Sequence, residues 1–230
     1  MSKLELTNPQ ILSHVDHTLL KPFATWNEID ALCAEAVEHK TASVCVPPAY
    51  IGRIHSKYGS NLTICTVVGF PLGYSTTGSK LSEVKQAIAD GALEVDMVIN
   101  ISDAKNGEFG KITEEISALK RACTQAGSSS LLKVIIETCY LSQEEKVELC
   151  RCVTDGGADY IKTSTGFGTD GATMDDVVLF GKHIGGNVKI KAAGGIKTRQ
   201  DMVDFIEAGC SRLGTSSAIK ILNSQATEGY

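Results

Sequence analysis

The 230-residue sequence lacks three features that would point to a nucleic acid or a membrane as its partner. It has no run of basic residues, and its formal net charge of −5 argues against a nucleic-acid surface or an acidic membrane surface. No apolar stretch approaches the ~18 residues that a membrane-spanning helix needs, and the amino terminus has no signal-peptide pattern. We therefore expect a soluble, cytoplasmic protein that binds neither nucleic acid nor a membrane.

Metal-ligand motifs are also missing, although the sequence has 8 cysteines and 5 histidines. No CxxC pair occurs, only Cys150 and Cys152 lie close together, and the histidines follow no metal-ligand spacing. Free thiols in a reducing compartment explain such scattered cysteines better than a zinc site or a disulfide framework. We expect no metal. Cys45, at the end of a predicted strand, is interpreted either as a reactive thiol near the mouth of the site or as an inert core thiol.

Short apolar runs alternate with helical patterns along the whole chain. Thr25 with Glu28 and Ser142 with Glu145 have the spacing of capping boxes, and Thr173 is predicted to cap another helix. The apolar runs predict strands at residues 13–17, 43–46, 62–68, 93–99, 131–136, 160–163, 188–191 and 212–214.

Eight strand-then-helix units without a break in composition predict a parallel sheet connected by helices. In a chain of this length, eight units favour closure into an α/β fold of the (β/α)8 TIM-barrel type, typically ~250 residues. An open, doubly wound sheet is the alternative, but the glycine fingerprint expected after its first strand is missing. We predict a single-domain barrel over residues 1–222 and a mobile tail over residues 223–230.

Lys162 follows an apolar run and precedes small hydroxyl residues and glycines, in the stretch from Ala158 to Gly168. Near the end of a buried strand, burial disfavours the ammonium form of a lysine. A neutral amine in such a place can form an imine with a bound carbonyl. The alternative is a strand-end lysine whose amine reaches the solvent.

Asp96 and Lys191 are polar residues inside apolar strands. Strand periodicity puts Val95 and Met97 on one face and Asp96 on the other, so Asp96 is expected to point into the barrel. There it belongs either to the site or to a structural ion pair. Lys191 ends the strand next to that of Lys162, so we expect the two amines to face each other and one of them to lose its proton.

Three further charged residues are interpreted as structural. Lys189 shares the strand face of Lys191, and is expected either to pair with a carboxylate near the barrel floor or to mark a bulge. Lys133 and Glu137 share one face of the fifth strand and are expected to extend the charge network.

A phosphorylated small molecule is predicted as the ligand. Glycines and hydroxyl residues follow the last two strands, in Gly194-Gly195-Ile196 and Gly214-Thr215-Ser216-Ser217. Backbone N–H groups at helix amino termini attract anions, and the loops after strands seven and eight are the usual phosphate site of such barrels. Asp16 and Thr18 are predicted to bind substrate hydroxyls, unless they only cap the turn after the first strand.

Four motifs together resemble the deoxyribose-phosphate aldolase family, over almost the whole chain. They are Asp16-His17-Thr18-Leu19-Leu20-Lys21-Pro22, Glu94-Val95-Asp96-Met97-Val98-Ile99-Asn100, Tyr160-Ile161-Lys162-Thr163-Ser164-Thr165-Gly166 and Lys191-Ala192-Ala193-Gly194-Gly195. The resemblance implies a class I aldolase without metal or organic cofactor. Such an enzyme reversibly cleaves 2-deoxy-D-ribose 5-phosphate to D-glyceraldehyde 3-phosphate and acetaldehyde. A cytoplasmic homodimer in deoxyribonucleotide catabolism is implied as well.

By this resemblance, Lys162 forms the Schiff base, and Asp96 and Lys191 donate or accept protons. The substrate and phosphate site is expected to comprise Asp16, Thr18, Thr165, Gly166, Gly194, Gly195, Ile196, Lys197, Gly214, Ser216 and Ser217. The chain departs from the commonest family pattern at three places, where it has Phe23 for a frequent aspartate, Lys197 for a frequent arginine and Ala218 for a common glycine.

Three other functions are compatible with the same residues. Another Schiff-base aldolase would act on a different sugar phosphate. A phosphosugar isomerase would use acid–base residues without an imine, so borohydride would trap nothing. A non-catalytic sugar-phosphate sensor would bind its ligand without turnover, and the presence of all three central residues argues against it.

Overall fold

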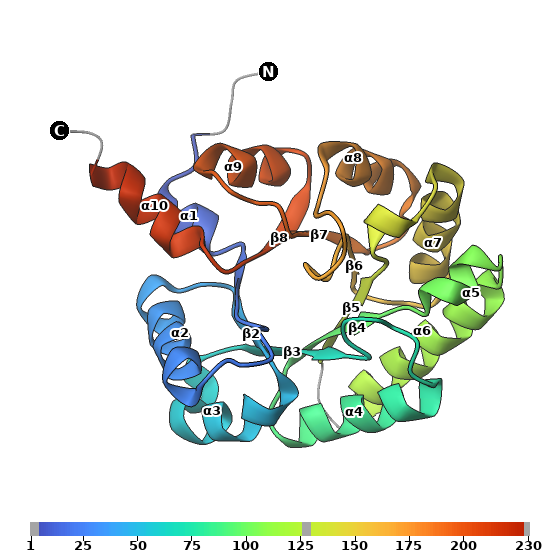
Figure 1. Ribbon diagram of the computed structural model, residues 1–230, viewed down its shortest axis with the longest axis horizontal. Helices are drawn as coiled ribbons and strands as arrows, with labels where there is room; N and C mark the ends of the chain where they lie inside the picture. The colour runs from blue at the N-terminus through green and yellow to red at the C-terminus, as the bar shows by residue number, and fades with distance from the viewer. Residues whose placement is uncertain (1–4, 126–129, 228–230) are drawn as a thin grey trace.

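The strands form a closed barrel in which each strand pairs in parallel with the next one along the chain and β8 pairs with β1. The computed structural model describes residues 5–125 and 130–227. Figure 1 looks down the barrel and shows the helices arranged as a ring around the strands. The predicted (β/α)8 barrel is therefore confirmed, and the open-sheet alternative is wrong.

The predicted strands agree with the observed ones to within a few residues. The strands are β1 (Val15–Thr18), β2 (Ser43–Val46), β3 (Ile64–Val68), β4 (Glu94–Val98), β5 (Leu131–Ile135), β6 (Tyr160–Lys162), β7 (Lys189–Ala193) and β8 (Cys210–Thr215). The principal helices between them are α2 (Trp26–His39), α3 (Ile51–Tyr58), α4 (Thr77–Ala89), α6 (Phe109–Gln125), α7 (Gln143–Asp155), α8 (Met174–His183), α9 (Arg199–Glu207) and α10 (Ala218–Thr227). Shorter helices are α1 (Asn8–Leu12), α5 (Ile101–Lys105), η1 (Pro48–Tyr50), η2 (Gly59–Asn61) and η3 (Thr138–Tyr140).

Side-chain caps begin the helices where the sequence predicts them. The capping boxes at the amino termini of α2 and α7 are formed as predicted, and the Thr173 side chain accepts a hydrogen bond from the backbone of Asp176 at the start of α8. Each cap satisfies backbone N–H groups that the helix itself leaves unpaired. These caps fix the residues at which the loops before α2, α7 and α8 end.

The first and the last helix, α1 and α10, lie side by side (Figure 1). The Asn8 side chain donates a hydrogen bond to the Leu222 carbonyl at 3.3 Å. Helix α10 continues to Thr227, beyond the predicted domain boundary at residue 222. Of the tail predicted to be mobile, residues 228–230 lie outside the described residues.

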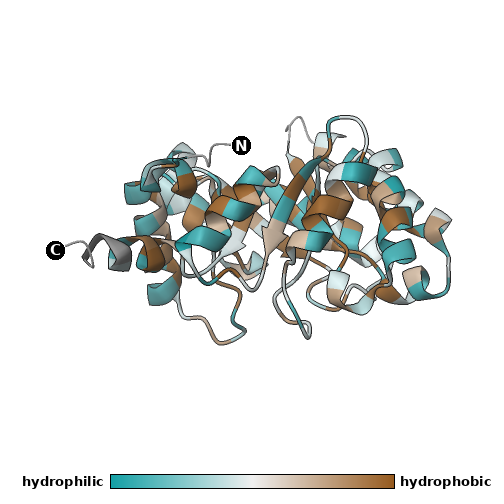
Figure 2. Cartoon of the chain, turned by 90° about the horizontal axis from the view of Figure 1, so that it is seen from above, coloured by the Kyte–Doolittle hydropathy of each residue, from teal (hydrophilic) through white to brown (hydrophobic). Residues whose placement is uncertain are grey.

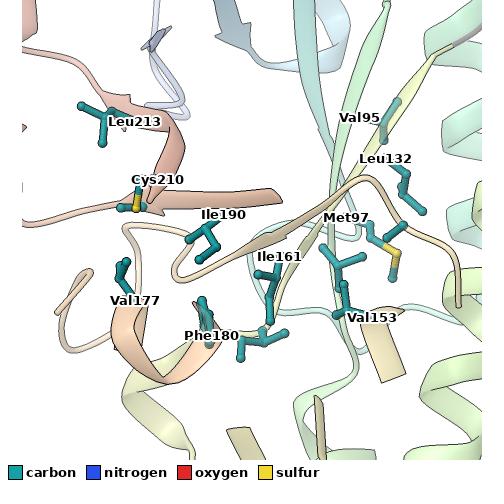
Figure 3. Close-up of a cluster of buried hydrophobic side chains, with 14 of the residues drawn as sticks. Val95, Met97, Leu132, Val153, Ile161, Val177, Phe180, Ile190, Cys210 and Leu213 are labelled. Carbon is teal, nitrogen blue, oxygen red and sulfur yellow. The ribbon is translucent and has the colours of Figure 1, made fainter. Parts of the chain in front are cut away.

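The main hydrophobic core lies between the strands and the surrounding helices. Val95, Met97 and Ile161 point away from the barrel axis and pack near Val153 of α7 and Phe180 of α8, as Figure 3 shows. The outer helices carry both hydrophilic and hydrophobic residues (Figure 2), as helices with one buried face do. Because successive residues of a strand alternate between its faces, the inside of the barrel is left to polar side chains.

The register between β7 and β8 is irregular. Ile190 lies opposite Cys210 but Lys191 lies opposite Arg212, so β8 has one extra residue at this point. Lys189 precedes the irregularity; it is exposed, and its Nζ lies 5.8 Å from the centre of the Tyr160 ring. Among the described residues Lys189 forms no ion pair with a carboxylate. The irregularity that was the alternative is present, but the extra residue lies in β8 and not in the strand of Lys189.

Across the two described ranges, no helix combines the length and the apolar character that crossing a lipid bilayer requires.

Candidate active site

A cavity of about 330 Å³ opens at the carboxyl ends of β1, β6, β7 and β8. This is the end at which barrels of this type carry their sites. Its wall contains ten of the sequence-predicted site residues, which are Thr18, Lys162, Thr165, Gly166, Gly194, Gly195, Ile196, Gly214, Ser216 and Ser217. Four predicted residues, Asp16, Asp96, Lys191 and Lys197, are not part of the wall.

Lys162 is the last residue of β6 and joins the cavity to a buried cluster of charges. Only 3% of the residue is exposed, so the alternative of an amine reaching bulk solvent is wrong. Its Nζ lies 2.7 Å from Oδ2 of Asp96. The amine therefore lies at the inner end of the cavity, where a bound carbonyl can reach it and bulk water is scarce.

Asp96 is fully buried in β4 and accepts hydrogen bonds at both carboxylate oxygens. Oδ2 accepts from Lys162 and from Lys191, each at 2.7 Å, and Oδ1 accepts from Lys133 at 2.8 Å. Burial alone would raise the pKa of this carboxyl, but the neighbouring lysines, above all Lys133, together outweigh burial and hold the pKa well below its usual range. Asp96 is thus a carboxylate at neutral pH.

Lys191 lies opposite Lys162 in the register of β6 and β7, and its amine is fully buried behind Asp96. Its Nζ lies 2.5 Å from Oδ2 of Asp16 and 2.7 Å from Oδ2 of Asp96. Burial lowers the pKa of Lys191, but the two carboxylates more than offset this and raise the pKa above its usual value. The two lysines are therefore bridged by a carboxylate and do not face each other across an empty gap.

Asp16 is not placed to bind a substrate hydroxyl. It lies within β1, is fully buried and does not line the cavity. Besides its ion pair with Lys191, Asp16 accepts hydrogen bonds at Oδ1 from Arg212 at 2.6 Å and from Ser43 at 2.8 Å. Burial raises the pKa of Asp16, but Lys191 and the neighbouring cations lower it further than burial raises it. Asp16 therefore helps to hold Lys191, one layer below the cavity.

Two residues of the barrel floor were not predicted from the sequence. Arg212 of β8 donates two hydrogen bonds to the Glu94 carboxylate of β4, at 2.9 and 2.8 Å. Lys133 pairs with Glu94 at 2.7 Å as well as with Asp96, so it extends the charge network as predicted. Glu137, by contrast, accepts its hydrogen bonds from Thr165 and stands apart from this network.

The charged cluster holds more cationic groups than anionic ones. Four cationic side chains meet three carboxylates. Lys191 bonds Asp16 and Asp96, Arg212 bonds Asp16 and Glu94, and Lys133 bonds Glu94 and Asp96 closely and Asp16 at 3.8 Å. Lys162 bonds Asp96 alone. If one cation of the cluster is neutral, the contacts single out Lys162.

Two turns line the cavity, at Gly194-Gly195 and at Ser216-Ser217. Gly194 and Gly195 both have left-handed φ angles, of 77° and 74°, which favour glycine. Ser216 and Ser217 directly precede α10, so the N–H groups of that helix terminus adjoin the cavity. The Gly194-Gly195 turn does not open a helix, because α9 begins only after its cap at Thr198.

The cationic side chains of the cavity wall are Lys162 and Lys21, a residue that we had not predicted for the site. Lys21 belongs to the loop between β1 and α2 and is exposed. Lys197 is exposed too but is not part of the wall, and its backbone N–H donates to Asp201 of α9 at 2.9 Å. Its position near the Gly194-Gly195 turn in the sequence does not carry its side chain into the cavity.

Two groups of side chains have the spacing of a metal site. The ligand atoms of Cys45, Cys65 and Asp96, and those of Asp16, Cys65 and Glu94, lie within 4.8 Å of one another. The carboxylate oxygens of both groups already accept hydrogen bonds from lysine or arginine, and a divalent cation would meet these ammonium and guanidinium groups at close range. Cys45 is fully buried and is not part of the cavity wall, which favours the interpretation as a core thiol.

Comparisons with known proteins agree on one family. A model of the DeoC/LacD family of aldolases matches residues 11–221. A deoxyribose-phosphate aldolase of Clostridium botulinum is 60% identical over 225 residues, which cover 98% of this chain and 100% of that protein. One from Clostridioides difficile is 54% identical over 220 residues, covering 96% and 99% of the two chains.

Solved structures show the same similarity. An aldolase called QR15 has a TM-score of 0.87 and 36% identity, with 95% of this chain and 96% of that chain covered. The deoxyribose phosphate aldolase of Aeropyrum pernix, described as a tetramer, has a TM-score of 0.87 and 29% identity, with 96% and 93% covered.

Proposed function

Because the chain belongs to the DeoC/LacD family of aldolases, we propose that it reversibly cleaves 2-deoxy-D-ribose 5-phosphate to D-glyceraldehyde 3-phosphate and acetaldehyde. The observation that carries this proposal is the position of the Lys162 amine, which lines the cavity and lies 2.7 Å from the Asp96 carboxylate. A coupled assay tests it by following glyceraldehyde 3-phosphate released from the sugar phosphate. Absence of release, or faster cleavage of a different sugar phosphate, contradicts it.

Lys162 is the nucleophile of the proposed reaction. Its neutral amine attacks the C1 aldehyde of the open-chain sugar, and loss of water gives an iminium, which withdraws electrons from the C2–C3 bond. A base removes the proton of the C3 hydroxyl, the C2–C3 bond breaks, and glyceraldehyde 3-phosphate leaves. Protonation of the remaining enamine at C2 and hydrolysis of the imine then release acetaldehyde and free Lys162.

The contacts of the cluster support Lys162 as the nucleophile. In a buried group of four cationic side chains and three carboxylates, Lys162 bonds one carboxylate, whereas each of the other three cations bonds two or more. Without Lys162, every carboxylate of the cluster keeps at least two cationic partners. The hydrogen bond that Lys162 donates to Asp96 keeps its nitrogen directed at the cavity.

Asp96 and Lys191 are the proton-transferring pair in this proposal. Both lie within hydrogen-bond reach of each other and next to the Lys162 nitrogen, so a water molecule between them and the substrate can carry protons in either direction. Asp96 accepts a proton as a carboxylate and Lys191 donates one as an ammonium. The opposite charges of the pair suit the two transfers that the reaction needs, one from the C3 hydroxyl and one to C2.

The phosphate of the substrate binds at the Gly194-Gly195 turn and at the amino terminus of α10. Backbone N–H groups supply most of the hydrogen bonds, and Thr18, Thr165 and Gly166 line the sugar between the phosphate and Lys162. A phosphate held away from the reacting bond places C1 against the amine, so binding energy assists the chemical step.

Ser217→Asp adds a negative charge to the proposed phosphate site. We expect the KM for deoxyribose 5-phosphate to rise about tenfold or more, equivalent to ~1.4 kcal/mol or more of lost binding, because the new carboxylate repels the phosphate. Turnover of unphosphorylated 2-deoxyribose should change little. Ser82→Asp, an added charge on the exposed face of α4, is the matched control. Equal losses with both substrates would remove this loop from the phosphate site.

Lys21→Gln removes the cation that we assign to the phosphate in place of Lys197. We expect the KM for deoxyribose 5-phosphate to rise roughly fivefold and to become less sensitive to salt, because screening acts on exposed charge pairs. Steady-state kinetics at two salt concentrations measure both effects. Lys197→Gln is the comparison, and a larger effect there than at Lys21 would reverse the assignment.

Three broader expectations stay part of the proposal. They are a cytoplasmic location, a homodimeric assembly and a role in deoxyribonucleotide catabolism, and they follow from the family. The relative from Aeropyrum pernix is described as a tetramer, so sedimentation of this protein is the direct measure of its assembly.

A further inference from the structure

Glu137 has a backbone conformation that a non-glycine residue rarely adopts. It follows β5 with φ 56° and ψ 67°, in the left-handed region. Apart from Lys40, it is the one non-glycine residue of the described ranges with a positive φ. Such a conformation costs free energy and persists where surrounding contacts hold it, often at functional sites. Lys40 ends a helix, where the conformation is common, whereas Glu137 lies at the catalytic end of the barrel.

The Glu137 side chain bonds only neutral donors. It is 2% exposed, and among the described residues it forms no ion pair. Oε1 accepts the backbone N–H of Thr165 at 3.0 Å, and Oε2 accepts the Thr165 hydroxyl. A charged acceptor makes stronger hydrogen bonds than a neutral one. Both oxygens of the carboxylate therefore restrain the same residue, Thr165, which lies three positions after Lys162 in the sequence.

Thr165 in turn restrains a neighbouring residue of the cavity wall. Its Oγ1 accepts the backbone N–H of Phe167 at 2.9 Å, and Thr165, Gly166 and Phe167 all line the cavity. The loop then folds back on Glu137, since a Cβ added at Gly168 would lie 3.2 Å from Cδ of Glu137. One buried carboxylate thus bonds Thr165 directly and reaches Phe167 through the Thr165 hydroxyl, within the segment that follows β6.

The same segment adjoins the turn after β7. A Cβ added at Gly194 would lie 3.7 Å from Cα of Gly166 and 3.1 Å from Cα of Gly171. A shift of the segment would therefore move the wall against which the sugar phosphate lies, while Lys162 would stay bonded to Asp96 from within β6.

We propose that Glu137 is a positioning residue, which acts through Thr165 to hold the segment Thr165–Phe167 in the place that binds the sugar phosphate. The inference rests on the proposed function. It assigns to Glu137 a role in substrate binding and none in forming the imine. The contacts predict that Glu137 and Thr165 act as one unit.

Five variants test this role: Glu137→Ala, Glu137→Gln, Thr165→Val, Thr165→Ser and the double variant Glu137→Ala/Thr165→Val. We expect Glu137→Ala and Thr165→Val each to raise the KM for deoxyribose 5-phosphate about tenfold, with a smaller change in kcat. The double variant should be no worse than either single one, because the two side chains form one link. Glu137→Gln and Thr165→Ser, which keep part of the link, should lie between these variants and the wild type.

Asp159→Asn is the matched control. Like Glu137, Asp159 is a carboxylate that accepts a backbone N–H from the neighbouring strand, here that of Leu132 in β5 at 2.7 Å. This contact lies at the opposite end of the β5–β6 pair, away from the cavity. The Asp159→Asn variant should have a lower melting temperature and an unchanged KM for deoxyribose 5-phosphate. Labelling of Lys162 by acetaldehyde and borohydride should proceed in the Glu137 variants as in the wild type. If Glu137→Ala does not fold, Glu137→Gln and Thr165→Val with their double variant give the same comparison.

Two results would overturn the role of Glu137 alone. One is a set of additive losses in Glu137 and Thr165 variants, and the other is a lower melting temperature with unchanged KM. Both leave the cleavage activity of the wild type in place. A wild-type protein that does not cleave deoxyribose 5-phosphate contradicts the proposed function and, with it, this inference.

Discussion

Lys162→Ala should lower kcat/KM for cleavage of deoxyribose 5-phosphate by roughly five orders of magnitude, about 7 kcal/mol of transition-state stabilisation. The loss is large because no other side chain at the cavity can replace the covalent step. Lys191 is held behind Asp96 by two carboxylates, and Lys21 lies in a loop at the cavity wall without the buried surroundings of Lys162. The coupled assay with purified protein measures the loss.

The Lys162→Ala variant should remain folded. Asp96 keeps its hydrogen bonds from Lys133 and Lys191, so the buried carboxylate still has cationic partners. Circular dichroism and thermal melting check this point. Lys189→Ala, which removes an exposed lysine from the other end of the barrel, is the matched control and should retain activity. Residual cleavage within about tenfold of wild type in Lys162→Ala would show that another group forms the intermediate.

Asp96→Asn should both abolish most of the activity and destabilise the fold by about 3–5 kcal/mol at pH 7. The neutral amide leaves the ammonium groups of Lys133 and Lys191 buried with fewer countercharges. Urea denaturation of variant and wild type measures the difference. Glu108→Gln breaks an exposed pair with Lys111 and should leave the stability nearly unchanged, since exposed pairs contribute little.

The difference in unfolding free energy between the wild type and Asp96→Asn should depend on pH in a direction that the structure predicts. The pKa of Asp96 is lowered in the folded state, so its contribution to stability is present above the unfolded pKa of roughly 3.9 and is lost as the pH falls through the folded pKa. The amide that replaces this carboxyl in the variant does not titrate. The stability gap between wild type and Asp96→Asn should therefore narrow on acidification below about pH 4. A gap that stays constant, or widens, between neutral and acid pH contradicts the assignment of Asp96 as the buried countercharge.

The fold was predictable because its determinants are local in the sequence. Apolar runs, capping residues such as Thr25 and Ser142, and the alternation of Val95, Asp96 and Met97 each report on a few neighbouring residues. In a barrel whose strands pair in chain order, these local signals also place β6 next to β7. The apposition of Lys162 and Lys191 could therefore be inferred without coordinates.

The parts of the site that were missed depend on distant residues. Arg212 reaches Glu94 and Asp16 because β8 carries an extra residue opposite β7, and a register irregularity leaves no clear pattern in the sequence. Asp16 lies within the predicted first strand, but its partners Lys191 and Arg212 come from β7 and β8, so the sequence did not show that it is buried among cations. Lys21 lines the cavity and the predicted Lys197 does not. This outcome depends on the paths of the loops after β1 and β7, which hydrophobic periodicity does not predict.

Trapping with acetaldehyde and borohydride, followed by mass mapping of the peptides, tests the central claim most directly. Reduction of the imine fixes an ethyl group on the nitrogen that formed it. The geometry predicts the label on Lys162, the amine that lines the cavity and bonds a single carboxylate. A label on Lys191 instead, or no label under conditions in which the enzyme turns over, would contradict it.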